Sequence, residues 1–145
     1  MAHEIEHKYL VIDDSYRDMS VGIHHITQGY LSRVPERVVR IRLLDDRGFL
    51  TVKGKNDGDI RLEFEYEIPA EDARHLLALC EGKIIDKTRY IVPFKGFTWE
   101  VDCFAGDDGL IVAEIELPSS DTAYPLPPFI GRNVTGQARY YNSNL

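Results

Sequence analysis

Cysteine is scarce in this sequence, and long apolar runs are absent. The 145 residues include only two cysteines, Cys80 and Cys103. Two are too few for a disulfide framework, and no cysteine and histidine cluster has the spacing of a zinc site. The first residues are charged, and neither a signal-peptide core nor an apolar stretch of membrane-spanning length occurs. We therefore expect a cytoplasmic protein with reduced thiols and no membrane partner.

An excess of positive charge is also lacking. The chain has 17 lysines and arginines against 24 aspartates and glutamates, a net charge of −7. Proteins that bind nucleic acids normally present a basic face, so we expect no nucleic-acid partner. A small polyanion remains compatible with this balance, because carboxylates hold a phosphate chain when divalent cations lie between the two.

Hydrophobic residues make up 43% of the chain and charged residues 28%, as in ordinary globular proteins. The length fits one domain over residues 1–145. One segment, 69–82, has helical periodicity, with Ala73, Leu76, Leu77 and Cys80 on one face. Gly82 is expected to end this helix as a left-handed cap. A weaker helix is expected within residues 13–26.

The rest of the chain alternates apolar and polar residues, which predicts half-buried strands. The expected strands are 3–11, 27–32, 37–45, 49–55, 60–68, 84–92, 98–104 and 110–117. Short turns between them favour antiparallel pairing, and eight strands of this kind can close into a barrel. The fold class is therefore α+β, mainly β: a closed eight-stranded antiparallel barrel with a few flanking helices.

The charged residues of these strands recur at every second position, so that they share one face. They are Glu4, Glu6 and Lys8; Arg40 and Arg42; Lys53; Arg61, Glu63, Glu65 and Glu67; Lys87 and Arg89; Glu100 and Asp102; and Glu114 and Glu116. A sheet with one solvated face also shows such alternation. However, a solvated face gains nothing from pairs of like charge two residues apart, and four of these groups are pairs of a single sign.

The other interpretation is that the charged face points into a water-filled barrel. The charges must then be paired with one another or with a ligand, because dry burial would cost several kcal/mol each. Arginines and lysines around such an interior would bind several phosphates, and clustered carboxylates would hold Mg²⁺ or Mn²⁺. A basic zone beside an acidic zone suits metal-assisted phosphoryl transfer.

Several motifs in order resemble those of a known family. They are the ExExK of Glu4-Ile5-Glu6-His7-Lys8, Gln28-Gly29-Tyr30-Leu31, the RxR of Arg40-Ile41-Arg42, the TxK of Thr51-Val52-Lys53, Arg61-Leu62-Glu63-Phe64-Glu65, Lys87-Thr88-Arg89-Tyr90, Trp99-Glu100-Val101-Asp102 and Ala113-Glu114-Ile115-Glu116. Over nearly the whole chain the sequence resembles the CYTH superfamily, the triphosphate tunnel metalloenzymes. It looks most similar to the short bacterial members that hydrolyse inorganic triphosphate.

The resemblance implies a role for each inward residue. It implies metal ligation by Glu4, Glu6, Glu114 and Glu116, with Asp102 nearby. It implies triphosphate binding by Lys8, Arg40, Arg42, Lys53, Arg61, Lys87 and Arg89, of which Lys8, Lys53 and Arg89 are expected to act in catalysis. Glu63 and Glu65 are expected to orient the lysines or join the metal shell, and Glu100 to pair with basic neighbours. The implied cofactor is Mg²⁺ or Mn²⁺.

The expected function is metal-dependent hydrolysis of inorganic triphosphate to pyrophosphate and phosphate. A class IV adenylate cyclase or a thiamine triphosphatase of the same family is the alternative, and a protein that binds polyphosphate without turning it over is another. The outward apolar face favours a homodimer. Tyr141 stands where a lysine is expected in close relatives, and the chain stops at Leu145, which leaves the closure of the tunnel end open.

Overall fold

Strands dominate the computed structural model, which describes residues 3–106 and 109–145. The elements are β1 (His3–Val11), α1 (Tyr16–Met19), β2 (Gly22–Ser32), β3 (Val38–Leu44), β4 (Arg47–Lys53), β5 (Ile60–Ile68), α2 (Ala70–Leu77), β6 (Glu81–Phe94), β7 (Phe97–Phe104), β8 (Ile111–Glu116), β9 (Ile130–Asn133) and the short 3₁₀ helices η1 (Ala138–Tyr140) and η2 (Asn142–Asn144). None of the helices in these described ranges is both long and apolar enough to cross a membrane.

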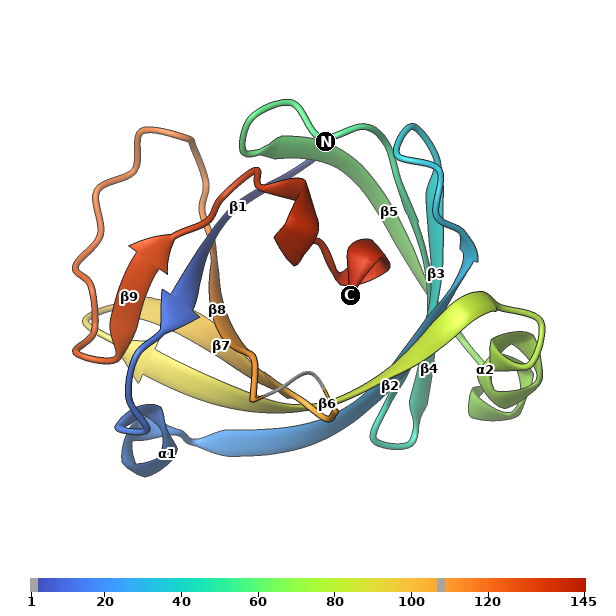
Figure 1. Cartoon of the computed structure of the whole chain (residues 1–145), viewed down its shortest axis with the longest axis horizontal. Helices are drawn as coiled ribbons and strands as arrows, with labels where there is room; N and C mark the ends of the chain where they lie inside the picture. Colours follow the sequence, from blue (N-terminus) through green and yellow to red (C-terminus); the bar gives the residue numbers. More distant parts are fainter. Residues whose placement is uncertain (1–2, 107–108) are drawn as a thin grey trace.

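The strands close into a barrel, viewed end-on in Figure 1. Their order is β5-β4-β3-β2-β6-β7-β8-β1-β9, and β5 also pairs with β1, so that the first eight strands form a ring. Each pairing is antiparallel. The prediction of a closed eight-stranded antiparallel barrel with a few helices is therefore confirmed. The extra strand β9 pairs with β1 at Tyr9 and Val11.

Two local predictions were wrong, the end of the helix expected over 69–82 and its glycine cap. The helix α2 ends at Leu77 with Ala78 in the right-handed region, and the amides of residues 78–80 bond back to carbonyls three residues earlier. Gly82, with φ +69°, lies inside β6 and does not cap the helix. The helix expected within 13–26 is confirmed as the single turn α1, and it is short because β2 begins at Gly22 and pairs there with β6. The strand β9 had not been predicted.

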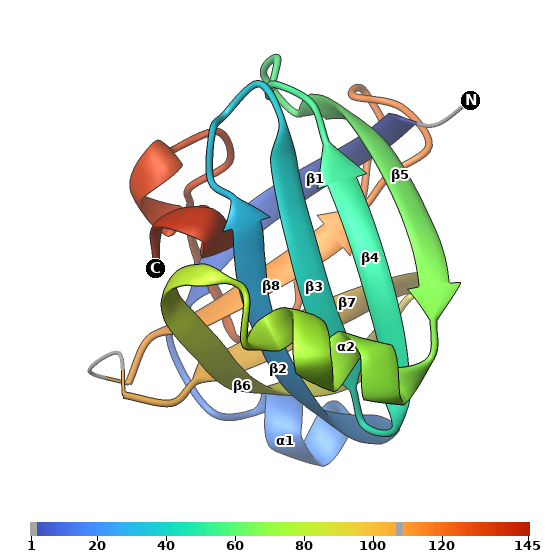
Figure 2. The ribbon, with the colours of Figure 1, turned by 90° about the vertical axis from the view of Figure 1, so that its right-hand side faces the viewer.

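The main apolar core lies on the outer side of the barrel wall. Trp99, Val101 and Ile115 are almost fully buried there, and they alternate along β7 and β8 with the inward charges. The loop around Phe129 and the helix α1 cover this cluster with further apolar side chains. On another part of the wall, Figure 2 shows α2 lying across β4 and β3. Packing thus fixes the outer face and leaves the charged face turned inward.

The short β1–β5 pairing that closes the ring is reinforced by side chains, and we call it the seam. His7 Nε2 donates to Asp59 Oδ2 (2.7 Å), and His7 Nδ1 then accepts the hydroxyl of Tyr124 (2.6 Å). Ser120 Oγ donates to Asp59 Oδ1 (2.7 Å), and the backbone N–H of Glu6 donates to the Asp59 carbonyl (3.1 Å). The seam therefore positions the strand that carries Glu4, Glu6 and Lys8.

We predict that His7→Leu destabilises the protein by about 1–3 kcal/mol, because it leaves Asp59 and Tyr124 half-buried without their partner. Urea unfolding would measure this change. His24→Leu is the matched control: His24 also bonds an aspartate, Asp45, at 2.6 Å, but both side chains are at least one-third exposed. Its effect should stay within about 0.5 kcal/mol. Equal effects of the two substitutions would contradict a structural role of the seam.

Candidate active site

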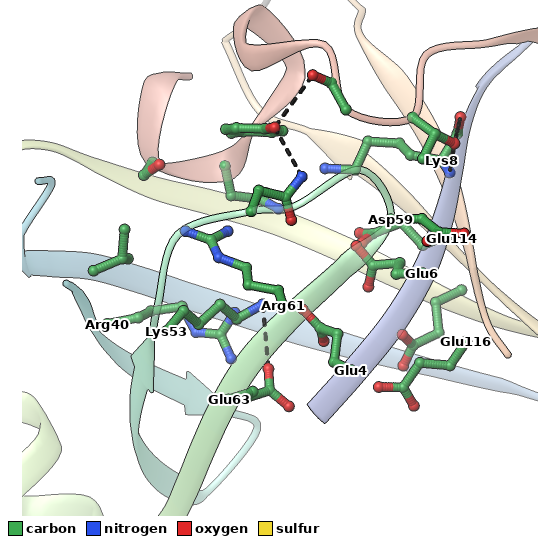
Figure 3. A pocket seen from close by; sticks show the side chains of 18 of the residues that line it. Glu4, Glu6, Lys8, Arg40, Lys53, Asp59, Arg61, Glu63, Glu114 and Glu116 are labelled. Carbon is green, nitrogen blue, oxygen red and sulfur yellow. Dashed lines mark hydrogen bonds and ion pairs between the residues drawn. The ribbon is translucent and has the colours of Figure 1, made fainter. Parts of the chain in front are cut away.

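The barrel encloses a cavity of about 240 Å³. Thirteen of the fifteen residues predicted for the site line it: Glu4, Glu6, Lys8, Arg40, Arg42, Lys53, Arg61, Glu63, Glu65, Arg89, Glu100, Glu114 and Glu116. Figure 3 shows several of these side chains converging from opposite walls. The predicted inward orientation of the charged faces is therefore what the structure has, and the solvated-sheet interpretation is excluded for these strands.

Three carboxylates gather at one end of the cavity. Oxygens of Glu4, Glu63 and Glu116 lie within 4.8 Å of one another. Burial raises the pKa of Glu116, and the charges of Glu4 and Glu63 raise it further. Burial also raises the pKa of Glu63. Three hard oxygen donors that repel one another are the donor set that a divalent cation such as Mg²⁺ or Mn²⁺ stabilises.

Lys53 lies between two of these carboxylates. Its Nζ is 2.9 Å from Glu4 and 3.2 Å from Glu63. Burial alone would raise the pKa of Glu4, but the charge and hydrogen bond of Lys53 bring it below its ordinary value. The ammonium group therefore keeps Glu4 ionised and available as a ligand.

Glu6 and Glu114 form a separate pair beside this trio. Their carboxyl groups are hydrogen-bonded to each other. Burial and the charge of Glu114 raise the pKa of Glu6, so Glu6 holds the shared proton. Burial opposes ionisation of Glu114 as well, but the charges of Lys8, Lys87 and Arg89 and the hydrogen bond from Glu6 lower its pKa. Of the four glutamates predicted as metal ligands, Glu4 and Glu116 thus join Glu63, whereas Glu6 and Glu114 join each other.

Three cations that line the cavity contact neutral acceptors only. Arg42 donates from Nε and Nη2 to Gln28 Oε1 (2.9 and 2.7 Å), Lys8 donates to the carbonyl of Tyr140 (2.9 Å), and Arg61 donates to the carbonyl of Gly54 (2.7 Å). Among residues 3–106 and 109–145, no carboxylate lies within ion-pair distance of these three. Burial and the charges of Arg40 and Arg89 lower the pKa of Arg42 to about 9. This zone therefore carries positive charge that an anion would stabilise.

Arg40 has spare donor capacity as well. Its Nη2 donates to Thr51 (3.1 Å) and lies 3.2 Å from Glu65, but its buried Nε has no partner among the described residues. A buried N–H of this kind is uncommon and costly. It marks a place where a ligand oxygen would complete the hydrogen bonding.

The two remaining predicted residues, Lys87 and Asp102, do not line the cavity and lie fully buried behind it. Asp102 Oδ2 is 2.8 Å from Lys87 Nζ, and both Asp102 oxygens accept from Arg89 at 2.8 and 2.9 Å. The metal role expected for Asp102 and the substrate role expected for Lys87 stay predictions. The geometry instead gives Asp102 the task of orienting Arg89, which also reaches Glu100 at 3.1 Å.

The C-terminal segment, residues 137–145, lies across one mouth of the barrel (Figure 1). Lys8 bonds to the Tyr140 carbonyl there, and Lys87 Nζ donates to Asn142 Oδ1 (3.1 Å). Arg33 donates to the Ser143 carbonyl. The cavity still reaches solvent, since 42% of each of the lining side chains Glu65 and Glu100 is exposed. The question of closure left open at Tyr141 is thus answered: the chain covers this mouth without a long helix.

Some lining residues had not been predicted. Asn56, Asp59 and Thr135 line the cavity from loops, as does Tyr141, and Asn142 lines it from the first residue of η2. Loop residues have no strand parity to indicate their orientation, so alternation could not find them. The polar run after Lys53 was the available signal for Asn56 and Asp59.

Comparisons with known proteins agree with this geometry. A family model described as CYTH domain matches residues 2–141. A protein of Acetivibrio thermocellus named inorganic triphosphatase is 48% identical over 147 residues, which cover 100% of this chain and 94% of that one. One of Nitrosomonas europaea with the same name is 33% identical, with 98% and 95% covered. The crystal structure of an inorganic triphosphatase superposes with a TM-score of 0.70 at 32% identity, covering 99% of this chain and 94% of the other.

Proposed function

The chain belongs to the CYTH domain family, and we propose that its tunnel hydrolyses inorganic triphosphate to pyrophosphate and phosphate. The observation that carries the proposal is the division of one cavity into two zones. Lys8, Arg42 and Arg61 have no carboxylate partner in the described part of the chain, and they share the cavity with the trio Glu4, Glu63 and Glu116. A chain of phosphates bound to a divalent cation complements both zones. Two relatives that carry the name inorganic triphosphatase support the choice of substrate.

We propose that Glu4, Glu63 and Glu116 hold the cation, and that it is Mg²⁺ or Mn²⁺, which prefer oxygen ligands and substrate phosphates. When bound, such an ion neutralises phosphate charge and lowers the pKa of an attacking water. This assignment replaces Glu6 and Glu114 by Glu63 in the set of ligands. It rests on the distances among the three carboxylates.

The chain's own residues then have distinct tasks. Arg42, Arg61 and Arg40 bind phosphate oxygens, where a guanidinium can make two parallel hydrogen bonds. Lys8 binds from the covered end, and Arg89 reaches the cavity while Asp102 holds it in place. The raised pKa of Glu6 favours its protonated form, which suits proton transfer to a leaving phosphate oxygen. In the net reaction a water oxygen bonds to the terminal phosphorus, and the bond from that phosphorus to the bridging oxygen breaks. The attacking water loses a proton to solvent, and the leaving oxygen takes up the proton from Glu6, which solvent then replaces.

Three further expectations stay predictions: a single domain over residues 1–145, a location in the cytoplasm and a homodimer. A homodimer would cover the exposed apolar side chains of β5, among them Phe64 and Tyr66, which are 40% and 59% exposed.

The test is phosphate release from inorganic triphosphate by purified protein with Mg²⁺ or Mn²⁺. We expect turnover that stops when EDTA removes the cation. Glu116→Gln should raise the cation concentration needed for half-maximal rate by at least about tenfold, since even residues that only orient metal ligands are worth about 10–100-fold in affinity. Glu67→Gln is the control, because Glu67 pairs with Arg47 and does not line the cavity.

Other products would identify the alternatives. Faster turnover of ATP to cyclic AMP, or of thiamine triphosphate, would contradict the proposed substrate. Tight triphosphate binding measured by calorimetry, without turnover under any cation, would indicate a binding protein.

A further inference from the structure

A second, smaller cavity of about 180 Å³ adjoins the tunnel. The two cavities share Val38, Asn56, Arg61, Tyr141 and Ser143, so these residues form the wall between them. Its remaining lining is of a different kind from that of the tunnel. Pro35 and Ala138 contribute apolar surface, and among its described lining residues there is no carboxylate.

Tyr141 is the largest side chain of this wall, and it is held from three sides. Asn56 Nδ2 donates to its hydroxyl (2.9 Å), and the hydroxyl donates to the Gly136 carbonyl (3.2 Å). The guanidinium of Arg61 lies over its ring, 5.8 Å from the centroid. Arg61 is in turn fixed by its bond to the Gly54 carbonyl (2.7 Å). The ring is therefore a fixed partition.

The direction of residues 4–8 in β1 indicates how a bound phosphate chain is oriented. Glu4, at the start of this stretch, belongs to the carboxylate trio, and Lys8, at its end, contacts the C-terminal segment. Four strand residues span roughly 13 Å. A triphosphate whose reacting end is at the carboxylates thus points its other end toward Lys8, Arg61 and the Tyr141 wall. Any organic group attached at that end would meet the wall.

We propose that Tyr141 is a specificity-determining residue, which restricts the tunnel to triphosphates without an organic substituent by separating it from the second cavity. The inference rests on the proposed function and deepens it. A volume of about 240 Å³ is below the roughly 300–1,000 Å³ typical of sites for drug-sized ligands. With the ring removed, the two cavities join, and their combined space enters that range. The surface of the second cavity, to which Pro35 and Ala138 contribute beside the cations Arg33 and Lys55, then suits a nucleoside attached to the phosphate chain.

The test compares ATP with inorganic triphosphate in Tyr141→Ala, Tyr141→Phe and the wild-type protein. We expect Tyr141→Ala to raise the ratio of kcat/KM for ATP to that for triphosphate by about tenfold or more, mainly through a lower KM for ATP. Tyr141→Phe keeps the partition and should keep the ratio within about twofold. Tyr66→Ala removes the same atoms from an exposed site and should leave the ratio unchanged.

Binding of the β,γ-methylene analogue of ATP, followed by calorimetry, separates this inference from the proposed function. Tighter binding of the analogue to Tyr141→Ala than to wild type supports the inference whether or not triphosphate is hydrolysed. An unchanged ratio and unchanged analogue affinity, in a Tyr141→Ala protein with wild-type circular dichroism, would overturn it. If wild-type protein hydrolyses no triphosphate while the analogue affinity rises in the variant, the proposed function fails and the role of the wall stands.

Discussion

Replacement of Arg42 by methionine should lower triphosphatase activity by about 10²–10³-fold without lowering stability. Arg42 is buried and donates two hydrogen bonds to Gln28, which is a neutral acceptor. A bound phosphate would therefore supply the negative charge that this guanidinium lacks at hydrogen-bond distance. Loss of one preorganised donor to a developing charge typically costs this much in rate. A buried charge without a carboxylate at ion-pair distance also costs several kcal/mol, and its removal offsets the loss of the bonds to Gln28.

Steady-state kinetics and urea unfolding on the same preparation would check both parts. Arg47→Met is the control, because Arg47 and its partner Glu67 are exposed and do not line the cavity, so the substitution should affect neither quantity. A variant of Arg42 that keeps full activity would show that this guanidinium does not bind the substrate. A large loss of stability would show that the hydrogen bonds to Gln28 are enough to compensate the burial of the Arg42 guanidinium in the native state.

Unlike the substitution of Arg42, Asp102→Asn should lower stability, with a loss of about 3–5 kcal/mol in the free energy of unfolding. Asp102 is fully buried and is the counter-charge of both Lys87 and Arg89. Removal of one partner of a buried ion pair leaves uncompensated charge, which is the costly case. Activity should fall as well, because Arg89 loses the carboxylate that orients it. Asp86→Asn, which removes the exposed partner of His25, should change stability by less than about 0.5 kcal/mol.

The same residue predicts an acid dependence. Burial by itself would raise the pKa of Asp102, but the charges of Lys87 and Arg89, with the hydrogen bonds from Arg89, lower it from 3.8 to about 2. A carboxyl group with a lowered folded pKa contributes stability above the unfolded pKa and loses it as the pH falls. Wild-type protein should therefore lose this contribution between about pH 4 and pH 2. Asp102→Asn should lack that part of the acid dependence, and parallel pH profiles of the two proteins would contradict it.

Local alternation predicted much of the barrel. The bounds expected for 3–11 and 60–68 coincide with β1 and β5, and the inward parity of the charged residues is what the structure has. The prediction failed where a segment is extended because it pairs with a neighbouring strand and its own sequence does not alternate. Residues 22–26 of β2 carry no alternating charge, and they are extended because β6 lies beside them. The strand β9 pairs with β1 at Tyr9 and Val11, beyond the residues 3–5 of β1 that pair with β5.

For the candidate site, too, the sequence motifs predicted which residues take part, but not which of them lie together. Motifs named the carboxylates but grouped Glu4, Glu6, Glu114 and Glu116 together, whereas the distances group Glu4 and Glu116 with Glu63. That choice depends on how β5 meets β1 at the seam, where Glu4 lies opposite Arg61. Neither strand contains this information by itself, because register is a property of the pair.

The sequence by itself determined which side chains face the interior and which family the chain belongs to, since a two-residue period and an ordered set of motifs are both written along the chain. Only the tertiary structure decided which carboxylates meet, where Asp102 lies, and how Tyr141 and the C-terminal segment bound the tunnel. The physical reason is closure. A strand carries its own alternation, but a barrel sets distances across its interior through the pairing of all its strands.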